Sequence, residues 1–296
     1  MNLADFLSRA AHFFPSRPAI CDNDVKTSYQ QVNAQANRVA TGLIRLGLAP
    51  GDHVGICAPN STDWLIVYFG VLKAGGVATT FSFSLQLDEL LRLVEHARPR
   101  FVFTTSERMG DFGKIREGAG IQLLIGDGGD LGLSDLMESG SQNFTNIRRE
   151  RDDTAAVLYT GGTSGIPKGV MLSHENIATS SFNVAYSERS DQNDRSICFL
   201  PLNHVFGQIH ILNATIFSCG CVELLPSYDL ERLLHLTSSG RVTKLYAVPT
   251  IYGRLLNIDD LRHRLGRVRY CFSAAASMAL EIVRHWKDIT GLTIYE

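Results

Sequence analysis

The sequence lacks an apolar run long enough to cross a bilayer. Its longest apolar stretch, residues 64–77, is interrupted by Lys73 and three glycines. A membrane-spanning helix needs about 20 consecutive apolar residues. Residues 1–5 also lack the charged segment and following apolar segment of a secretory signal peptide. The sequence therefore predicts a cytoplasmic protein without a transmembrane segment.

An excess of charge of one sign is absent as well. The chain has 28 Lys and Arg against 30 Asp and Glu, for a formal net charge of -2. Proteins that bind nucleic acid usually carry a basic patch, and those that bind membrane surfaces carry basic amphipathic segments. We therefore expect neither nucleic acid nor a membrane as partner. With 45% hydrophobic residues, the composition is that of a globular protein with a large core.

Metal-ligand spacing is also missing. The six cysteines are scattered, and the closest pair is Cys219-Gly-Cys221. No second pair of cysteines or histidines stands at the spacing of a zinc site. We expect the cysteines to be reduced and to fill the core as small apolar residues, with no metal bound to them.

What the sequence does contain is a regular alternation of short apolar runs with segments of helical periodicity. A helix is predicted over residues 2–13, a hairpin turns at Asn23-Asp24, and Ser28 caps the next helix. Alternating strands and helices favour parallel sheets covered by helices. We predict an α/β fold of two stacked lobes, residues 1–125 and 154–296, joined by a polar surface connection over 126–153.

The most informative stretch is residues 159–170, Tyr-Thr-Gly-Gly-Thr-Ser-Gly-Ile-Pro-Lys-Gly-Val, between two short apolar runs. Glycines allow positive φ and let successive amides form an anion-binding nest. Hydroxyls and a lysine add hydrogen-bond donors and a positive charge. The residues predicted to bind phosphate are Thr160, Gly161, Gly162, Thr163, Ser164, Gly165 and Lys168.

Other phosphate-binding motifs do not match this loop. A Walker A motif requires Gly before the lysine and Ser or Thr after it, whereas here Pro167 precedes Lys168 and Gly169 follows. The glycine spacing also differs from that of the dinucleotide fingerprint. A plain surface hairpin is the alternative, but three hydroxyls, three glycines and a Pro-Lys-Gly exit are a more specific combination.

At these residues the sequence resembles the adenylate-forming superfamily of acyl-CoA synthetases, aryl-CoA ligases, luciferases and adenylation domains. Their loop reads Tyr-Thr-Ser-Gly-Thr-Thr-Gly-x-Pro-Lys-Gly-Val, from which this chain departs at Gly161 and Ser164. The resemblance implies ATP-dependent activation of a fatty or aryl carboxylic acid to an acyl-adenylate, followed by thioester formation with coenzyme A. It also implies that Lys168 is catalytic and that Lys168 and the loop hydroxyls hold the β- and γ-phosphates. Mg²⁺ would neutralise the remaining phosphate charge.

Two further segments resemble the superfamily. Pro201-Leu-Asn-His204 matches Pro-Leu-x-His, which implies that His204 is catalytic and faces both the acyl group and the adenylate; Asn203 stands where many members have Phe. Ser273-Ala-Ala-Ala matches Ser-Gly-Gly-Ala, the backbone shelf under the adenine, and alanine at 274 is expected to restrict the backbone. The implied acyl-pocket residues are His204, Val205, Phe206, Gly207, Val248 and Tyr252, and the implied adenine-shelf residues are Ala274, Ala275 and Ala276.

The resemblance extends from the first helix to Tyr295-Glu296. The superfamily continues with Tyr-Gly-x-Thr-Glu, a small barrel and a C-terminal domain that carries a catalytic lysine. We therefore expect an N-terminal portion with little or no activity of its own, for which the C-terminal portion is a candidate partner. An adenylating enzyme that loads a carrier protein, and an inactive fragment that binds nucleotide or acyl ligand, remain as alternatives.

Overall fold

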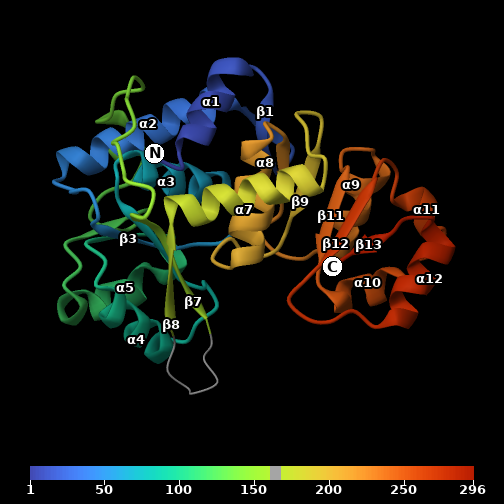
Figure 1. Ribbon diagram of the computed structural model, residues 1–296. Coiled ribbons are helices and arrows are strands. Elements are labelled where there is room, and N and C mark those ends of the chain that lie inside the picture. The colour runs from blue at the N-terminus through green and yellow to red at the C-terminus, as the bar shows by residue number, and fades with distance from the viewer. Residues whose placement is uncertain (161–167) are drawn as a thin grey trace.

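The computed structural model describes residues 1–160 and 168–296, so the predicted phosphate-binding residues 161–165 lie outside the described residues. Two β-sheets are flanked by helices, and the predicted α/β class is confirmed (Figure 1). Among the described residues, no helix combines the length and apolar character needed to cross a membrane.

The first sheet has six strands in the order β6-β5-β3-β4-β7-β8. Its strands are β3 (His53–Cys57), β4 (Val77–Thr80), β5 (Phe101–Thr104), β6 (Leu123–Ile125), β7 (Thr154–Thr160) and β8 (Lys168–Ser173). All neighbours pair in parallel except β7 and β8, which form an antiparallel hairpin. That hairpin flanks the glycine-rich residues, as the sequence predicts.

The second sheet has seven strands in the order β13-β12-β11-β9-β10-β1-β2. Its strands are β1 (Pro18–Asp22), β2 (Val25–Ser28), β9 (Arg195–Cys198), β10 (Cys221–Leu224), β11 (Lys244–Ala247), β12 (Tyr270–Ser273) and β13 (Ile294–Tyr295). Only β1 and β2 pair antiparallel. Asn23 and Asp24 turn between them with φ of 46° and 66°, a left-handed conformation that Asn and Asp adopt readily, so the predicted hairpin is confirmed.

The two sheets do not follow the predicted division into residues 1–125 and 154–296. The early hairpin β1–β2 joins the second sheet through β10, and the later hairpin β7–β8 joins the first sheet through β4. Strand pairing depends on which apolar surfaces are buried together, not on proximity in sequence. The intervening residues 126–153 are not merely a surface connection, since Leu136 is 1% exposed and its side chain packs against Gly42.

Thirteen helical segments cover and separate the sheets in the described part of the chain. They are α1 (Asp5–Phe13), α2 (Tyr29–Arg45), α3 (Thr62–Lys73), α4 (Leu87–Ala97), α5 (Ser106–Ala119), α6 (Leu133–Glu138), α7 (His174–Ser187), the π-helix η1 (Phe206–Asn213), α8 (Ala214–Phe217), α9 (Leu230–Ser238), α10 (Pro249–Leu255), α11 (Leu261–Arg264) and α12 (Leu280–Thr290). Ser28 caps α2 in a capping box with Gln31, as expected.

A shared core joins the two sheets. Helix α3 is buried from Trp64 to Lys73, which is typical of a helix that is apolar on all sides. It belongs to one cluster that includes Ile20 of β1 and Val54 of β3, one residue from each sheet.

All six cysteines are buried free thiols, as predicted. No group of three or more His, Cys, Asp or Glu able to hold a metal ion occurs among the described residues.

Candidate functional site

The end of the β7–β8 hairpin holds the predicted phosphate-binding residues that the structure describes. Thr160 pairs with Lys168 across the hairpin, and both side chains are exposed. Directly before them, Tyr159 stacks on Phe81 with ring centroids 5.8 Å apart, and its hydroxyl lies 2.8 Å from His96 Nδ1. Burial raises the pKa of Tyr159 to about 12. These contacts anchor the hairpin end to α4 and fix the position of Thr160 and Lys168.

The turn that carries His204 is held by a buried asparagine. Asn60 is 5% exposed; its Nδ2 donates to the carbonyls of Leu200 and Leu225 at 2.9 and 3.2 Å. Its Oδ1 accepts from the Leu202 N–H at 2.9 Å, and Gln208 Nε2 donates to the Leu202 carbonyl at 2.8 Å. Asn60 was not predicted from the sequence. The only signal was a polar side chain three residues after a strand that ends at the ligand-binding edge of a parallel sheet.

His204 is exposed at the start of η1, with its ring position set by the backbone. The Phe206 N–H donates to His204 Nδ1 at 3.3 Å, and the His204 N–H donates to the Pro201 carbonyl at 3.0 Å. Because Nδ1 accepts, the neutral ring carries its proton on Nε2. The Nε2–H is then available to donate to a bound carboxylate or phosphate.

A cavity of about 150 Å³ lies between the β7–β8 hairpin and this turn. It is lined by Leu158, Tyr159, Thr160, Val170, Leu172, Asn203, His204 and Val205. The structure thus brings Thr160 and His204 to one cavity, although they lie 44 positions apart in the sequence. We call this space the His204 cavity.

A second cavity of about 220 Å³ adjoins it, with Val205 common to both. It is lined by Ser180, Val205, Phe206, Ile209, His210, Phe272 and Ala274. Val205 and Phe206 were predicted for the acyl pocket and Ala274 for the adenine shelf, and here they line one space. We call this second space the aromatic cavity.

Three residues predicted for the acyl pocket do not line either cavity. Gly207 is buried, and a Cβ there would lie 2.5 Å from the Pro201 carbonyl oxygen, so glycine serves the tight turn. Tyr252 is 0% exposed, and its hydroxyl donates to the carbonyls of Leu245 and Phe272 at 3.0 and 3.1 Å. Val248 packs against the same core cluster as Tyr252. The side chains of Tyr252 and Val248 thus pack in the core, and Gly207 serves the turn.

The predicted adenine shelf contains backbone in an unusual conformation. Ala275 has a φ of 75°, in the left-handed region that costs an L-residue roughly 1–2 kcal/mol. The position where alanine restricts the backbone is therefore Ala275, one residue after the predicted Ala274. Ala275 and Ala276 are exposed.

A buried polar network stands behind the aromatic cavity. His210 Nε2 lies 2.9 Å from Glu188 Oε1, while Lys244 Nζ and the Tyr246 hydroxyl donate to Glu188 Oε2 at 2.9 and 2.5 Å. The side chains of Glu188 and Lys244 are 2% and 1% exposed. A carboxylate and an ammonium buried this deeply are paired because each alone would lose its hydration.

The network keeps Glu188 charged and holds the ring of His210, which lines the aromatic cavity. Burial by itself would raise the pKa of Glu188, but the hydrogen bond from His210 and the charge of Lys244 hold that pKa below its ordinary value. Glu188 is therefore ionised, and its Oε1 accepts a hydrogen bond from His210 Nε2. His210 was not predicted as a site residue. The missed signal was Lys244, a lysine inside an apolar strand that requires a buried carboxylate.

Comparison with known proteins places this arrangement in a family. The model of the family described as AMP-binding enzyme matches residues 7–296. The chain belongs to the AMP-binding enzyme family. The chain spans about half the length of the curated relatives it matches, for example 54% of 4-coumarate-CoA ligase 1 from Narcissus pseudonarcissus, which is 27% identical over 95% of this chain.

Solved structures agree with the AMP-binding family. ATP-bound MatB from Rhodopseudomonas palustris is 32% identical, with a TM-score of 0.90 over 99% of this chain and 59% of that chain. The anthranilate CoA ligase AuaEII in complex with anthranoyl-AMP is 25% identical, with a TM-score of 0.92 over 99% of this chain and 59% of that chain. The resemblance stated from the loop, the His204 segment and the alanine shelf is thus confirmed at the level of the family.

Proposed function

We propose that this chain supplies the ATP-binding and acid-binding groups of an AMP-forming carboxylic acid–CoA ligase. In that reaction the carboxylate attacks the α-phosphorus of ATP, giving an acyl-adenylate and pyrophosphate. The thiol of coenzyme A then attacks the acyl carbon and releases AMP. The observation that carries the proposal is the pair of adjoining cavities around Val205, one at the hairpin end and one lined by aromatic rings.

Residues that line the His204 cavity, and Lys168 beside it at the hairpin end, fit the needs of a phosphate-bearing ligand. Thr160 and Lys168, side by side at the hairpin end, offer a hydroxyl and an ammonium to the phosphates. The Nε2–H of His204 is free to donate to the reacting carboxylate or to the developing charge at the phosphorus. Positioning and electrostatic stabilisation of this kind carry most of the catalysis in reactions at phosphorus.

Mg²⁺ and coenzyme A are required by the proposed reaction. Mg²⁺ at nucleotide sites is held mainly by substrate phosphates, with one or two carboxylates. No carboxylate is found among the described residues that line the two cavities, so we assign no metal ligand to them. When bound, Mg²⁺ neutralises phosphate charge; Lys168 adds a charge from the protein side.

The aromatic cavity favours an aryl acid over a long-chain fatty acid. Phe272 lies against His210 with ring centroids 4.3 Å apart, and Phe206 lies 5.4 Å from His210 and 5.9 Å from Phe272. Flat rings stack favourably on such walls. The imidazole of His210 adds a polar group to this wall, which suits an acid with a hydroxyl or amino substituent. A carrier protein in place of coenzyme A would use the same two cavities and the same first step.

The test begins with binding, because adenylation depends on both cavities. ATP and a panel of acids, including benzoate, 4-hydroxybenzoate and hexanoate, are titrated into the chain by calorimetry, and acid-dependent exchange of pyrophosphate into ATP is measured. We expect ATP to bind and hydroxylated aryl acids to bind more tightly than hexanoate. Absence of ATP binding would contradict the proposal, whereas binding without exchange would limit the chain to a binding role.

Lys168→Ala tests the hairpin end. A charge-assisted hydrogen bond to phosphate is worth about 1.5–3 kcal/mol, so ATP should bind roughly 10- to 150-fold more weakly while acid binding is unchanged. Lys114→Ala, which also removes a lysine from the first half of the chain, is the matched control and should leave ATP binding unaltered. Equal ATP affinity of the Lys168 variant and the wild type would remove Lys168 from the site.

A further inference from the structure

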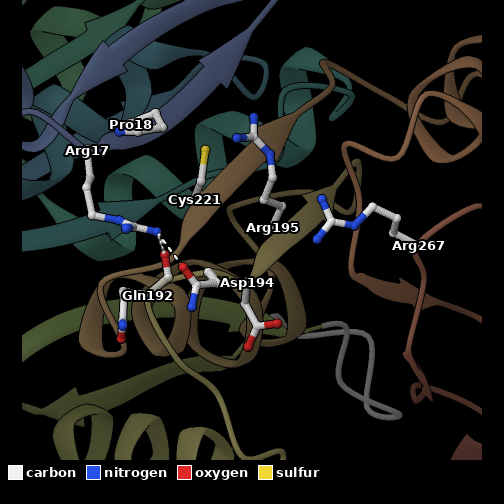
Figure 2. Close-up of a pocket in the computed structure, with 8 residues that line it drawn as sticks. Arg17, Pro18, Gln192, Asp194, Arg195, Cys221 and Arg267 are labelled. Carbon is white, nitrogen blue, oxygen red and sulfur yellow. Dashed lines mark hydrogen bonds between the residues drawn. The ribbon is translucent and has the colours of Figure 1, made fainter.

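A third cavity, of about 190 Å³, opens where three neighbouring strands of the second sheet begin. Its lining includes Pro18, Arg195 and Cys221, the first residues of β1, β9 and β10 (Figure 2). These strands run parallel, so their first residues share one edge of the sheet. His204 follows the other end of β9. The third cavity is therefore separated from the His204 cavity by the length of the strand.

Three arginines line this third cavity: Arg17, Arg195 and Arg267. Figure 2 shows Arg17 and Arg267 on opposite sides, with Arg195 between them. Arg195 forms an ion pair with Glu223. Within residues 1–160 and 168–296, neither Arg17 nor Arg267 has a carboxylate in ion-pair contact. Arg17 Nη2 donates only to neutral oxygens, the Gln192 carbonyl and Asn193 Oδ1, the latter at 3.0 Å.

The single carboxylate of the lining, Asp194, does not neutralise these arginines. It is 3% exposed and is already engaged by Arg269, whose Nη2 lies 2.7 Å from both carboxylate oxygens. Thr243 Oγ1 donates to Asp194 Oδ1 at 2.9 Å, and Lys244 Nζ lies 3.5 Å from Oδ2. The negative charge of Asp194 is thus balanced by cations outside the cavity, and the cavity itself keeps an excess of positive charge.

We propose that this cavity is a phosphate-binding site separate from the site of ATP. Guanidinium groups bind phosphate oxygens through two parallel N–H donors, and they do so best where several converge. The side chain of Arg267 makes no hydrogen bond within the described residues, and Arg17 and Arg195 each retain N–H groups beyond those already donating. A phosphate group, either free or at the end of an organic molecule, supplies the negative charge and the acceptors that these donors lack.

The test uses this chain and two probes, inorganic phosphate and glycerol 3-phosphate, titrated by calorimetry in a buffer free of phosphate. We expect one bound probe per chain and weaker binding at higher salt. Arg267→Gln should weaken binding at least about tenfold, the usual cost of one charge-assisted hydrogen bond. Arg267→Glu should abolish binding. Arg284→Gln, which changes an exposed arginine on α12, is the matched control and should bind as the wild type does.

A Lys168→Ala background separates this site from the His204 cavity. Binding that persists in Lys168→Ala, weakens at least about tenfold in Arg267→Gln and disappears in Arg267→Glu supports the proposal, whichever of the two probes binds. If only glycerol 3-phosphate binds, the ligand is a phosphorylated organic molecule; if inorganic phosphate binds equally, free phosphate suffices. Binding lost with Lys168 and kept with Arg267→Gln, or no binding of either probe, overturns the proposal. Thermal unfolding of each variant, followed by the buried Trp64 and Trp286, confirms that it is folded.

Discussion

Glu188→Gln tests whether the buried network behind the aromatic cavity holds η1 and the end of α7 against strand β11. Gln keeps the size of the side chain but removes the charge that faces Lys244, 2.9 Å away and 1% exposed. Breaking a buried ion pair by removing one partner costs about 3–5 kcal/mol. Asp194, 3.5 Å from Lys244, still compensates part of the ammonium charge. We therefore expect the lower end, about 3 kcal/mol, or a fall in Tm of about 6 °C for a chain of this size.

The assay is urea unfolding and calorimetry of the purified chain at neutral pH. The matched control is Glu175→Gln, at the start of the helix that Glu188 follows. Glu175 pairs with Arg151 at 3.0 Å, but the two side chains are 42% and 71% exposed, so its loss should cost less than about 1 kcal/mol. The double variant Glu188→Gln/Lys244→Met should recover most of the loss, since no unpaired charge remains buried.

Two outcomes would refute the role of the buried charge at Glu188. The first is an equal loss of stability in Glu188→Gln and Glu175→Gln, which would mean that burial does not strengthen the pair. The second is a double variant less stable than Glu188→Gln, which would mean that Lys244 contributes by packing and not by charge. Binding of hydroxylated aryl acids to Glu188→Gln adds a readout at the cavity. It should weaken relative to benzoate, because the neutral amide oxygen of the introduced glutamine is a weaker acceptor than the carboxylate that holds the His210 ring.

Three further predictions concern single residues. His204→Ala should slow acid-dependent pyrophosphate exchange while leaving Tm unchanged, since the ring is exposed. An unchanged exchange rate would mean that His204 has no role in adenylation. Burial, and next the charge of Arg149, lower the pKa of His174 to about 4. As the pH falls below about 6.5, His174 is protonated in the unfolded chain before it is protonated in the folded chain. The free energy of unfolding should therefore fall by up to about 3 kcal/mol between about pH 6.5 and pH 4. His174→Gln should remove that slope in urea titrations; a slope kept by the variant contradicts this. Ala275→Gly should raise the free energy of unfolding by up to about 1 kcal/mol. Glycine relieves the left-handed strain at residue 275, and the greater flexibility of the unfolded chain offsets only part of that gain. A lower free energy of unfolding in the variant would mean that Ala275 is not strained.

The sequence by itself determined the local structure. The Asn23-Asp24 turn, the Ser28 cap and the hairpin around the glycine-rich residues all depend on neighbouring residues, so propensity and periodicity suffice to predict them. The family was also visible in the loop and in the Pro-Leu-x-His segment, because both are contiguous. Of the predicted site, Thr160, His204, Val205, Phe206 and Ala274 line the two cavities.

Only the tertiary structure decided which strands share a sheet. The early hairpin β1–β2 belongs to the sheet built mostly from later strands, and the later hairpin β7–β8 belongs to the sheet built mostly from earlier strands. Strand pairing follows the burial of apolar surface between segments that are distant in the sequence. The same holds for groups whose chemistry depends on a distant partner. The ring of His210 is held by Glu188, the charge of Glu188 is balanced by Lys244, and the arginine-lined cavity is positive because of residues 17, 195 and 267. A buried ion pair or a converging set of arginines leaves no periodic mark on the sequence, because its members are brought together only when the sheet forms.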